Sequence, residues 1–137
     1  MFYCTFAQNP KRGYIRHAVS PDLDQWTTLE DEILPADGEI YRMEEWRDPF
    51  VFWNEEEGKW WMLIAANAVG KTNRRSCVGL CVSDDLHHWE YRQPFYKPME
   101  CGGACECPDL FKIGEWYYLV FSYYCDRFQT EIGRAHV

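Results

Sequence analysis

Two short stretches of the sequence carry the residues best suited to acid–base chemistry. In residues 105–111, the carboxylate Glu106 lies beside a thiol, just before a proline and an apolar run. In residues 46–53, the acid Asp48 also precedes a proline and an apolar run. Two neighbouring carboxylates can divide the work of bond cleavage, one donating a proton while the other stays ionised. We therefore expect Glu106 and Asp48 to occupy matching positions in two repeated units.

The chain repeats itself at a spacing of about 60 residues, which is typical of propeller blades and related arrays. Three pairs of segments match: 16–26 with 80–89, 46–52 with 105–111, and 58–64 with 114–120. The offset falls from 63 to 59 to 56 positions along the chain. The length changes therefore lie between the matched segments, in loops that tolerate them.

The repeated units are predicted to consist of short strands. Apolar runs joined by short polar turns predict three strand pairs: 50–53 with 60–65, 77–83 with 89–92, and 110–113 with 116–122. No stretch shows sustained helical periodicity with caps. This pattern predicts an all-β fold, a partial β-propeller of about two four-stranded blades with repeat units at about 14–66 and 77–124. Two blades cannot close a ring, because propellers have at least about four.

Composition excludes several classes of partner. The chain has 14 basic and 22 acidic residues and a net charge of −8, which argues against nucleic acid or an anionic membrane surface. No apolar run is long enough to span a bilayer. Localisation stays undetermined, although the odd number of 7 cysteines slightly favours a reducing, cytoplasmic compartment.

No metal or cofactor is predicted. Cys101, Cys105 and Cys107 are close in sequence, but no Cys-x-x-Cys pair or nearby histidine completes a set of four ligands. The histidines at 87–88 lie in a predicted turn and are expected to face solvent. The acids at 44–45 are interpreted as solvated loop charges.

The C-terminal residues depart from the aromatic β pattern. Residues 132–137, Ile-Gly-Arg-Ala-His-Val, can be back-translated into a common sequencing-library adapter. We therefore expect these six residues to be a non-native tail, and residues 1–131 to be part of a longer propeller domain.

The two acid-bearing stretches resemble a known enzyme family. Trp-Arg-Asp-Pro at 46–49 and Glu-Cys-Pro-Asp at 106–109, in this order, resemble two signatures of glycoside hydrolase family 32, the invertases, levanases and inulinases. The resemblance extends over most of the chain, from about residue 2 to residue 124. It implies a five-bladed propeller with sucrose or a fructan bound in a central funnel, and a retaining β-fructofuranosidase activity without a cofactor.

The resemblance also implies roles for particular residues. Glu106 matches the family's general acid/base, and Asp48 matches the aspartate that binds fructosyl hydroxyls and stabilises the transition state. Arg47 and Cys107 are expected beside them as substrate-binding residues, and Asp109 in a supporting role.

Trp46 is the aromatic ring that we expect nearest the sugar. It directly precedes the Arg-Asp-Pro triplet, and flat aromatic faces often line carbohydrate sites. Trp26 and Trp89, at equivalent positions of the repeat, are expected to pack structurally instead.

The family's nucleophile has no counterpart in the sequence. It is an aspartate in an Asn-Asp-Pro-Asn type motif, and the nearest stretch, Gln-Asn-Pro at 8–10, has no acid before the proline. We therefore expect this chain to be inactive alone. Two alternatives stay open: another propeller glycosidase, related to arabinanases or xylosidases, and a catalytically dead propeller that binds carbohydrate or plays a structural role.

Overall fold

The computed structural model describes residues 1–70, 75–98 and 103–124, and the regular secondary structure of this part of the chain consists entirely of β-strands. The nine strands are β1 (Phe2–Gln8), β2 (Lys11–Val19), β3 (Thr27–Pro35), β4 (Tyr41–Asn54), β5 (Lys59–Ala68), β6 (Ser76–Ser83), β7 (Glu90–Tyr96), β8 (Ala104–Ile113) and β9 (Trp116–Tyr124). The all-β prediction is confirmed. Within the described residues, no helix has the length and apolarity needed to cross a membrane. The predicted tail at 132–137 lies outside the described residues.

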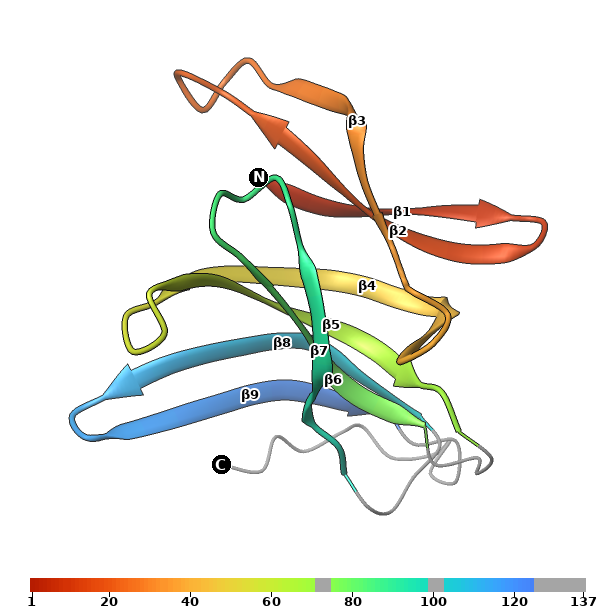
Figure 1. The fold of residues 1–137 in the computed structure, drawn as a ribbon, viewed down its shortest axis with the longest axis vertical. Helices are drawn as coiled ribbons and strands as arrows, with labels where there is room; N and C mark the ends of the chain where they lie inside the picture. Colours follow the sequence, from red (N-terminus) through yellow and green to blue (C-terminus); the bar gives the residue numbers. More distant parts are fainter. Residues whose placement is uncertain (71–74, 99–102, 125–137) are drawn as a thin grey trace.

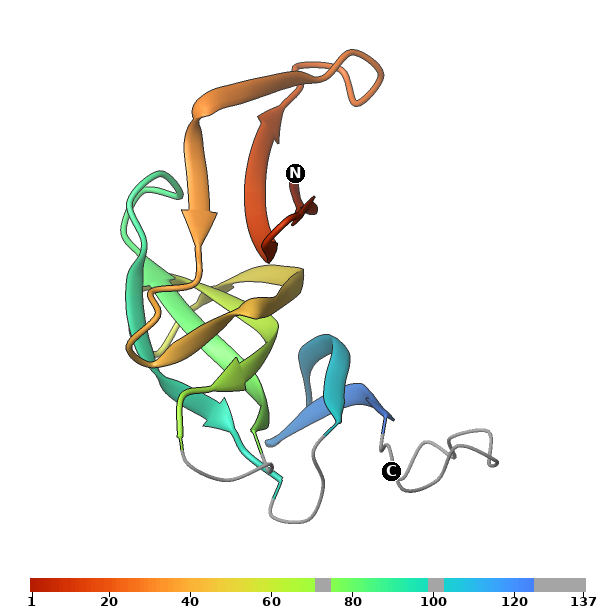
Figure 2. The ribbon, with the colours of Figure 1, turned by 90° about the vertical axis from the view of Figure 1, so that its right-hand side faces the viewer.

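The strands form three antiparallel sheets that follow one another along the chain. Their orders are β1-β2-β3, β4-β5-β6-β7 and β8-β9, and every hydrogen-bonded pair is adjacent in sequence. Figures 1 and 2 show the β4–β7 sheet in the middle, with β1–β3 on one side and β8–β9 on the other. In the described residues, the fold is a partial β-propeller in which one four-stranded sheet lies between a three-stranded and a two-stranded sheet. The prediction of a partial β-propeller is confirmed.

The sequence repeat is out of phase with the sheets. The unit at about 14–66 contains nearly all of β2 to β5, and the unit at about 77–124 contains β6 to β9. Each unit therefore joins the last two strands of one sheet to the first two of the next. Similarity between segments does not depend on which strands share hydrogen bonds, so the repeat and the blades have different boundaries.

The turns that follow β2 and β6 explain the strongest part of the repeat. In the first, Ser20 Oγ accepts the N–H of Leu23 at 2.9 Å, and Asp22 Oδ1 accepts that of Gln25 at 2.9 Å. These bonds hold Leu23 at a φ of 66°, in the left-handed region that costs an L-residue energy. The second turn repeats this pattern: Ser83 Oγ accepts the N–H of Leu86, and Asp85 Oδ1 accepts that of His88. Leu86 has a φ of 68°.

Two tryptophans complete these turns. Trp26 Nε1 donates to the carbonyl of Leu23 at 3.2 Å, and Trp89 Nε1 donates to that of Leu86 at 3.1 Å. The structural role expected for both tryptophans agrees with this geometry, since each indole closes the turn that precedes it.

The two inner strands of the central sheet, β5 and β6, are largely buried on both faces. On β5, Met62 and Ile64 face the core shared with the first sheet, whereas Leu63 between them faces the core shared with the third sheet. On β6, Cys77 and Cys81 take the first side and Val78 takes the second. Alternate side chains of a strand point to opposite faces. A strand covered on both faces therefore reads as a continuous apolar run, as these two do.

Tyr41, at the start of β4, links three strands of the central sheet through the hydrogen bonds of its hydroxyl group. Its hydroxyl donates to the carbonyl of Arg92 at 2.7 Å and accepts the N–H of Leu80 at 3.0 Å, where the β6–β7 register shifts. Burial raises the pKa of Tyr41, so the hydroxyl stays protonated and available as a donor.

Candidate active site

Strands β4 and β8 break their regular pairing at equivalent places. The register with the next strand shifts between Arg47 and Phe50 on β4, and between Glu106 and Asp109 on β8. Each shift contains a proline, which cannot donate to the ladder and so favours a bulge. The residue before each proline has positive φ: 55° at Asp48 and 49° at Cys107. Such bulges redirect side chains, and here they set the direction of the predicted site residues.

The two acids do not occupy equivalent positions, which corrects the sequence prediction. Aligning the bulges pairs Arg47 with Glu106, and Asp48 with Cys107. Glu106 therefore lies one residue before the left-handed position that Asp48 occupies. The offset of 59 between the matched segments also pairs Arg47 with Glu106. The expectation of matching acids rested only on an acid near each proline, and the structure shows that these two acids have different backbone settings.

The structure brings four of the predicted site residues together across two sheets. Arg47 Nη2 lies 2.7 Å from Glu106 Oε1, and Arg47 Nε lies 3.9 Å from Asp48 Oδ2. The N–H of Cys107 donates to Asp48 Oδ2 at 3.1 Å. We call Arg47, Asp48, Glu106 and Cys107 the carboxylate cluster. The Arg47, Asp48 and Glu106 side chains are 18%, 24% and 39% exposed, so a solute can reach them.

Cys107 is a donor in this cluster. Its Sγ lies 3.8 Å from Asp48 Oδ2. Burial and the nearby Asp48 carboxylate raise the pKa of the Cys107 thiol. The thiol therefore stays protonated at neutral pH, which suits hydrogen bonding to Asp48 and not nucleophilic attack.

The prediction that Trp46 contacts sugar is wrong. Its side chain is 0% exposed and packs between Tyr41 and Tyr91, with ring centroids 5.0 and 6.0 Å away. Its Nε1 donates to the carbonyl of Leu34 on β3 at 3.1 Å. A ring with no accessible face cannot stack on a ligand, so Trp46 instead joins the first sheet to the second.

Asp109 lies beyond the bulge and is exposed. It pairs in register with Val120 of β9. Within the described residues, no hydrogen bond or ion pair joins Asp109 to the carboxylate cluster.

Glu45 was missed as part of this site. The interpretation of the acids at 44–45 as loop charges is wrong for Glu45, which lies on β4 with its Oε2 2.8 Å from Arg47 Nη1. Its Oε1 is also 2.8 Å from Lys11 Nζ. The signal was available in the spacing, because residues two apart on a strand share a face. Arg47 therefore lies between two carboxylates, Glu45 and Glu106, and this fixes its orientation.

The fold and this site define a class of protein: a β-propeller with carboxylates gathered where the first strands of neighbouring sheets meet. Residues 39–132 match the family model described as the glycosyl hydrolases family 32 N-terminal domain. The chain therefore belongs to glycosyl hydrolases family 32.

Individual relatives agree with this assignment. An extracellular exo-inulinase of Aspergillus niger is 30% identical over 92 residues, covering 64% of this chain and 16% of the relative. A levanase of Bacillus subtilis is 33% identical over 90 residues, covering 64% of this chain and 12% of the relative. The chain thus spans less than a fifth of the length of either relative.

A solved structure shares the fold. The β-fructofuranosidase of Bombyx mori superposes with a TM-score of 0.68 at 22% identity, covering 88% of this chain and 26% of that one. At this level of identity, the similarity concerns the fold alone.

Proposed function

We propose that the chain is part of a retaining β-fructofuranosidase-type glycoside hydrolase that acts on sucrose or fructans. Family membership supports the reaction class, and the relatives named above are an inulinase and a levanase. The observation that carries the proposal is the carboxylate cluster. It holds Glu106 and Asp48 on neighbouring first strands through one arginine, 2.7 Å from Glu106 and 3.9 Å from Asp48.

In the proposed mechanism, Glu106 is the general acid/base. It protonates the glycosidic oxygen as the bond to the fructosyl unit breaks, and it then accepts a proton from the attacking water. Its partly exposed carboxyl group can reach a bound substrate. Arg47 holds this carboxyl group in place, and the second carboxylate on Arg47, Glu45, keeps the arginine from turning away.

Asp48 is proposed to stabilise the transition state. Its carboxylate accepts the N–H of Cys107 and can accept fructosyl hydroxyls with its remaining lone pairs. A fixed negative charge favours the oxocarbenium-like transition state over the neutral ground state. Arg47 and Cys107 are proposed to line the substrate site, with Asp109 supporting it at the rim.

The 137-residue chain is proposed to be inactive alone. A retaining mechanism needs a second carboxylate about 5–5.5 Å from the acid, acting as nucleophile. We assign that role to none of the residues in this chain, because the sequence contains no Asn-Asp-Pro-Asn type motif. Incubation of the purified chain with sucrose, inulin and levan should release no more fructose than its Glu106→Gln variant does. Release that depends on Glu106 would contradict this part of the proposal.

The acid role is tested in a longer protein recovered by sequencing the source DNA through both ends of this reading frame. Glu106→Gln should lower kcat on sucrose or inulin by about 10²–10⁴-fold, because the leaving oxygen loses its proton donor. The loss should be much smaller for an aryl fructoside, whose leaving group needs little protonation. Glu55→Gln, in the exposed loop between β4 and β5, is the matched control and should leave kcat unchanged.

Asp48→Asn separates the second role from the first. It should lower kcat to a similar extent for the aryl fructoside and for sucrose, since charge develops on the sugar ring in both reactions. Equal losses for both substrates in Glu106→Gln would argue against the acid role. Sugar binding without hydrolysis in the longer protein would favour the alternative of a catalytically dead, carbohydrate-binding propeller.

A further inference from the structure

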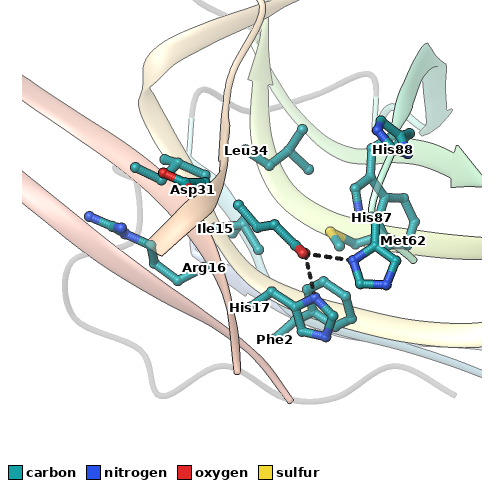
Figure 3. A pocket seen from close by; sticks show the side chains of 12 residues that line it. Phe2, Ile15, Arg16, His17, Asp31, Leu34, Met62, His87 and His88 are labelled. Atoms are coloured by element: carbon teal, nitrogen blue, oxygen red, sulfur yellow. Dashed lines mark hydrogen bonds and ion pairs between the residues drawn. The ribbon is translucent and has the colours of Figure 1, made fainter. Parts of the chain in front are cut away.

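A second group of chemistry-bearing side chains lies at the junction of the first two sheets, apart from the carboxylate cluster (Figure 3). His17 lies on β2, Glu32 on β3, and His87 in the turn between β6 and β7. His17 Nδ1 is 2.8 Å from Glu32 Oε2, and His87 Nδ1 is 2.7 Å from Glu32 Oε1. One potential ligand atom from each residue lies within 4.8 Å of the other two.

The two imidazoles are held in position by their surroundings. The ring of Phe2 stacks on His17 at 4.2 Å and 15°, and Trp89 packs edge-on against Phe2 at 5.6 Å and 89°. The N–H of His87 donates to Asp85 Oδ1 at 2.9 Å, which fixes the turn that carries it. Ligands fixed before binding lose little conformational entropy when an ion arrives.

The group opens into a cavity of about 410 Å³. Its wall includes His17, Glu32 and His87 together with Arg16 and His88. Figure 3 draws the side chains that line the cavity and labels both His17 and His87. An ion held by the three ligands would therefore have room on the cavity side for water or a small ligand.

The sequence repeat makes His17 unexpected. At the repeat offset of 63, position 17 corresponds to Leu80, a buried apolar residue. The His17 side chain is only 8% exposed, and a buried imidazole costs free energy unless its nitrogens are paired. Glu32 pairs with Nδ1 of His17 and also with His87, in the turn between β6 and β7 of the neighbouring sheet. No cysteine takes part, so the cysteine spacings that argued against a metal in the sequence do not bear on this site.

We propose that His17, Glu32 and His87 form a zinc site that links the first sheet to the second and leaves one coordination position open to the cavity. Two imidazoles and one carboxylate are a ligand set that binds Zn²⁺ with a free fourth position. Bonds of about 2.0–2.2 Å in a tetrahedral centre set the ligand atoms about 3.3 Å apart. The carboxylate oxygens therefore separate from the rings by roughly half an ångström on binding, a movement that side-chain rotation can provide.

The test uses the full 137-residue chain, stripped with a chelator, and ZnCl₂ as the probe. Calorimetric titration should show one Zn²⁺ per chain, and added zinc should raise Tm, because zinc bound only by the folded state stabilises it. His87→Gln should weaken binding by more than about 100-fold, since losing even an outer partner of a ligand costs about 10–100-fold. His87 is half-exposed in a turn, so this variant is expected to fold.

His88→Gln is the matched control. The His88 side chain is 91% exposed and lines the same cavity, but it bonds Asp85 and not Glu32. The His88→Gln variant should bind zinc with the same affinity as the unchanged chain. Co²⁺ provides a second readout: tetrahedral His₂Glu ligation gives visible d–d absorption without the near-ultraviolet band of thiolate ligation, which separates this site from the free cysteines.

Three outcomes would overturn the proposal. Zinc binding that is unchanged in His87→Gln would place the ion elsewhere. A thiolate band in the Co²⁺ spectrum would assign the ion to cysteines. No binding, with Tm unaffected by zinc, would leave only a hydrogen-bonded His–Glu–His bridge.

Discussion

At the scale of single residues, the two bulges hold each other in place. Asp48 and Cys107 both adopt left-handed backbone conformations, with φ of 55° and 49°, and each such non-glycine residue costs about 1–2 kcal/mol. The Cys107 N–H donates to the Asp48 carboxylate, so the bulge on one sheet supplies a partner for the bulge on the next. This hydrogen bond offsets part of the free energy that the two left-handed backbone conformations cost, and it keeps the Asp48 carboxylate fixed.

Trp46 provides a prediction at the residue scale. Trp46→Phe removes the hydrogen bond to the Leu34 carbonyl and leaves part of a buried site empty. The free energy of unfolding should fall by about 1–3 kcal/mol in urea denaturation of the chain. Trp116→Phe is the matched control. Because Trp116 is 73% exposed, this substitution should change the free energy of unfolding very little. An unchanged stability in Trp46→Phe, with weaker sugar binding in the longer protein, would restore the role first expected for this ring.

At the scale of elements, the close approach of β2 to β4 joins the first two sheets. A Cβ added at Gly13 on β2 would overlap the carbonyl oxygen of Trp46 on β4. The neighbouring atom belongs to the backbone, which cannot rotate away as a side chain does. Only glycine therefore allows β2 to pack directly on the strand that carries Arg47 and Asp48.

Gly13→Ala tests this contact. It should lower the free energy of unfolding by about 1–3 kcal/mol or more, because overpacking forces the backbones apart. Gly70→Ala is the control, since its added Cβ would meet nothing within 4 Å. Thermal denaturation of both variants gives the comparison. Equal Tm values for the two would show that the β2–β4 junction tolerates separation.

At the scale of the whole molecule, burial is uneven across the three sheets. Every residue of β6 is buried, and most of β5 is buried as well. On β9, among residues 116–123, only Leu119 and Phe121 are half-buried, and Trp116 is 73% exposed. A two-stranded sheet with one such strand has little apolar surface to stabilise it independently.

Hydrogen exchange should follow this difference. In the isolated chain, amide protons of β5 and β6 should exchange only through global unfolding, whereas those of β8 and β9 should exchange through local opening. Exchange followed by mass spectrometry on peptides from each sheet measures this directly. Protection of β8 and β9 equal to that of β6 would mean that the three sheets unfold as one unit.

The sequence by itself determined the class of fold, the repeat and the identity of the acid-bearing stretches. Strand periodicity, turn residues and proline positions are local properties, so the pairs β4–β5, β6–β7 and β8–β9 and the paired turns could all be predicted. The sequence also located Arg47, Asp48, Glu106 and Cys107, because short motifs carried them.

Only the tertiary structure decided how these pieces are combined. Hydrogen bonding between strands decided which strands form a blade, and the blade boundaries lie half a repeat unit away from the boundaries of the sequence repeat. Contact between β4 and β8 brought Arg47 within 2.7 Å of Glu106. Packing between sheets buried Trp46 and brought together His17, Glu32 and His87, whose positions span 70 residues of sequence. Contacts between sheets depend on which faces meet, and no local pattern in the chain records that.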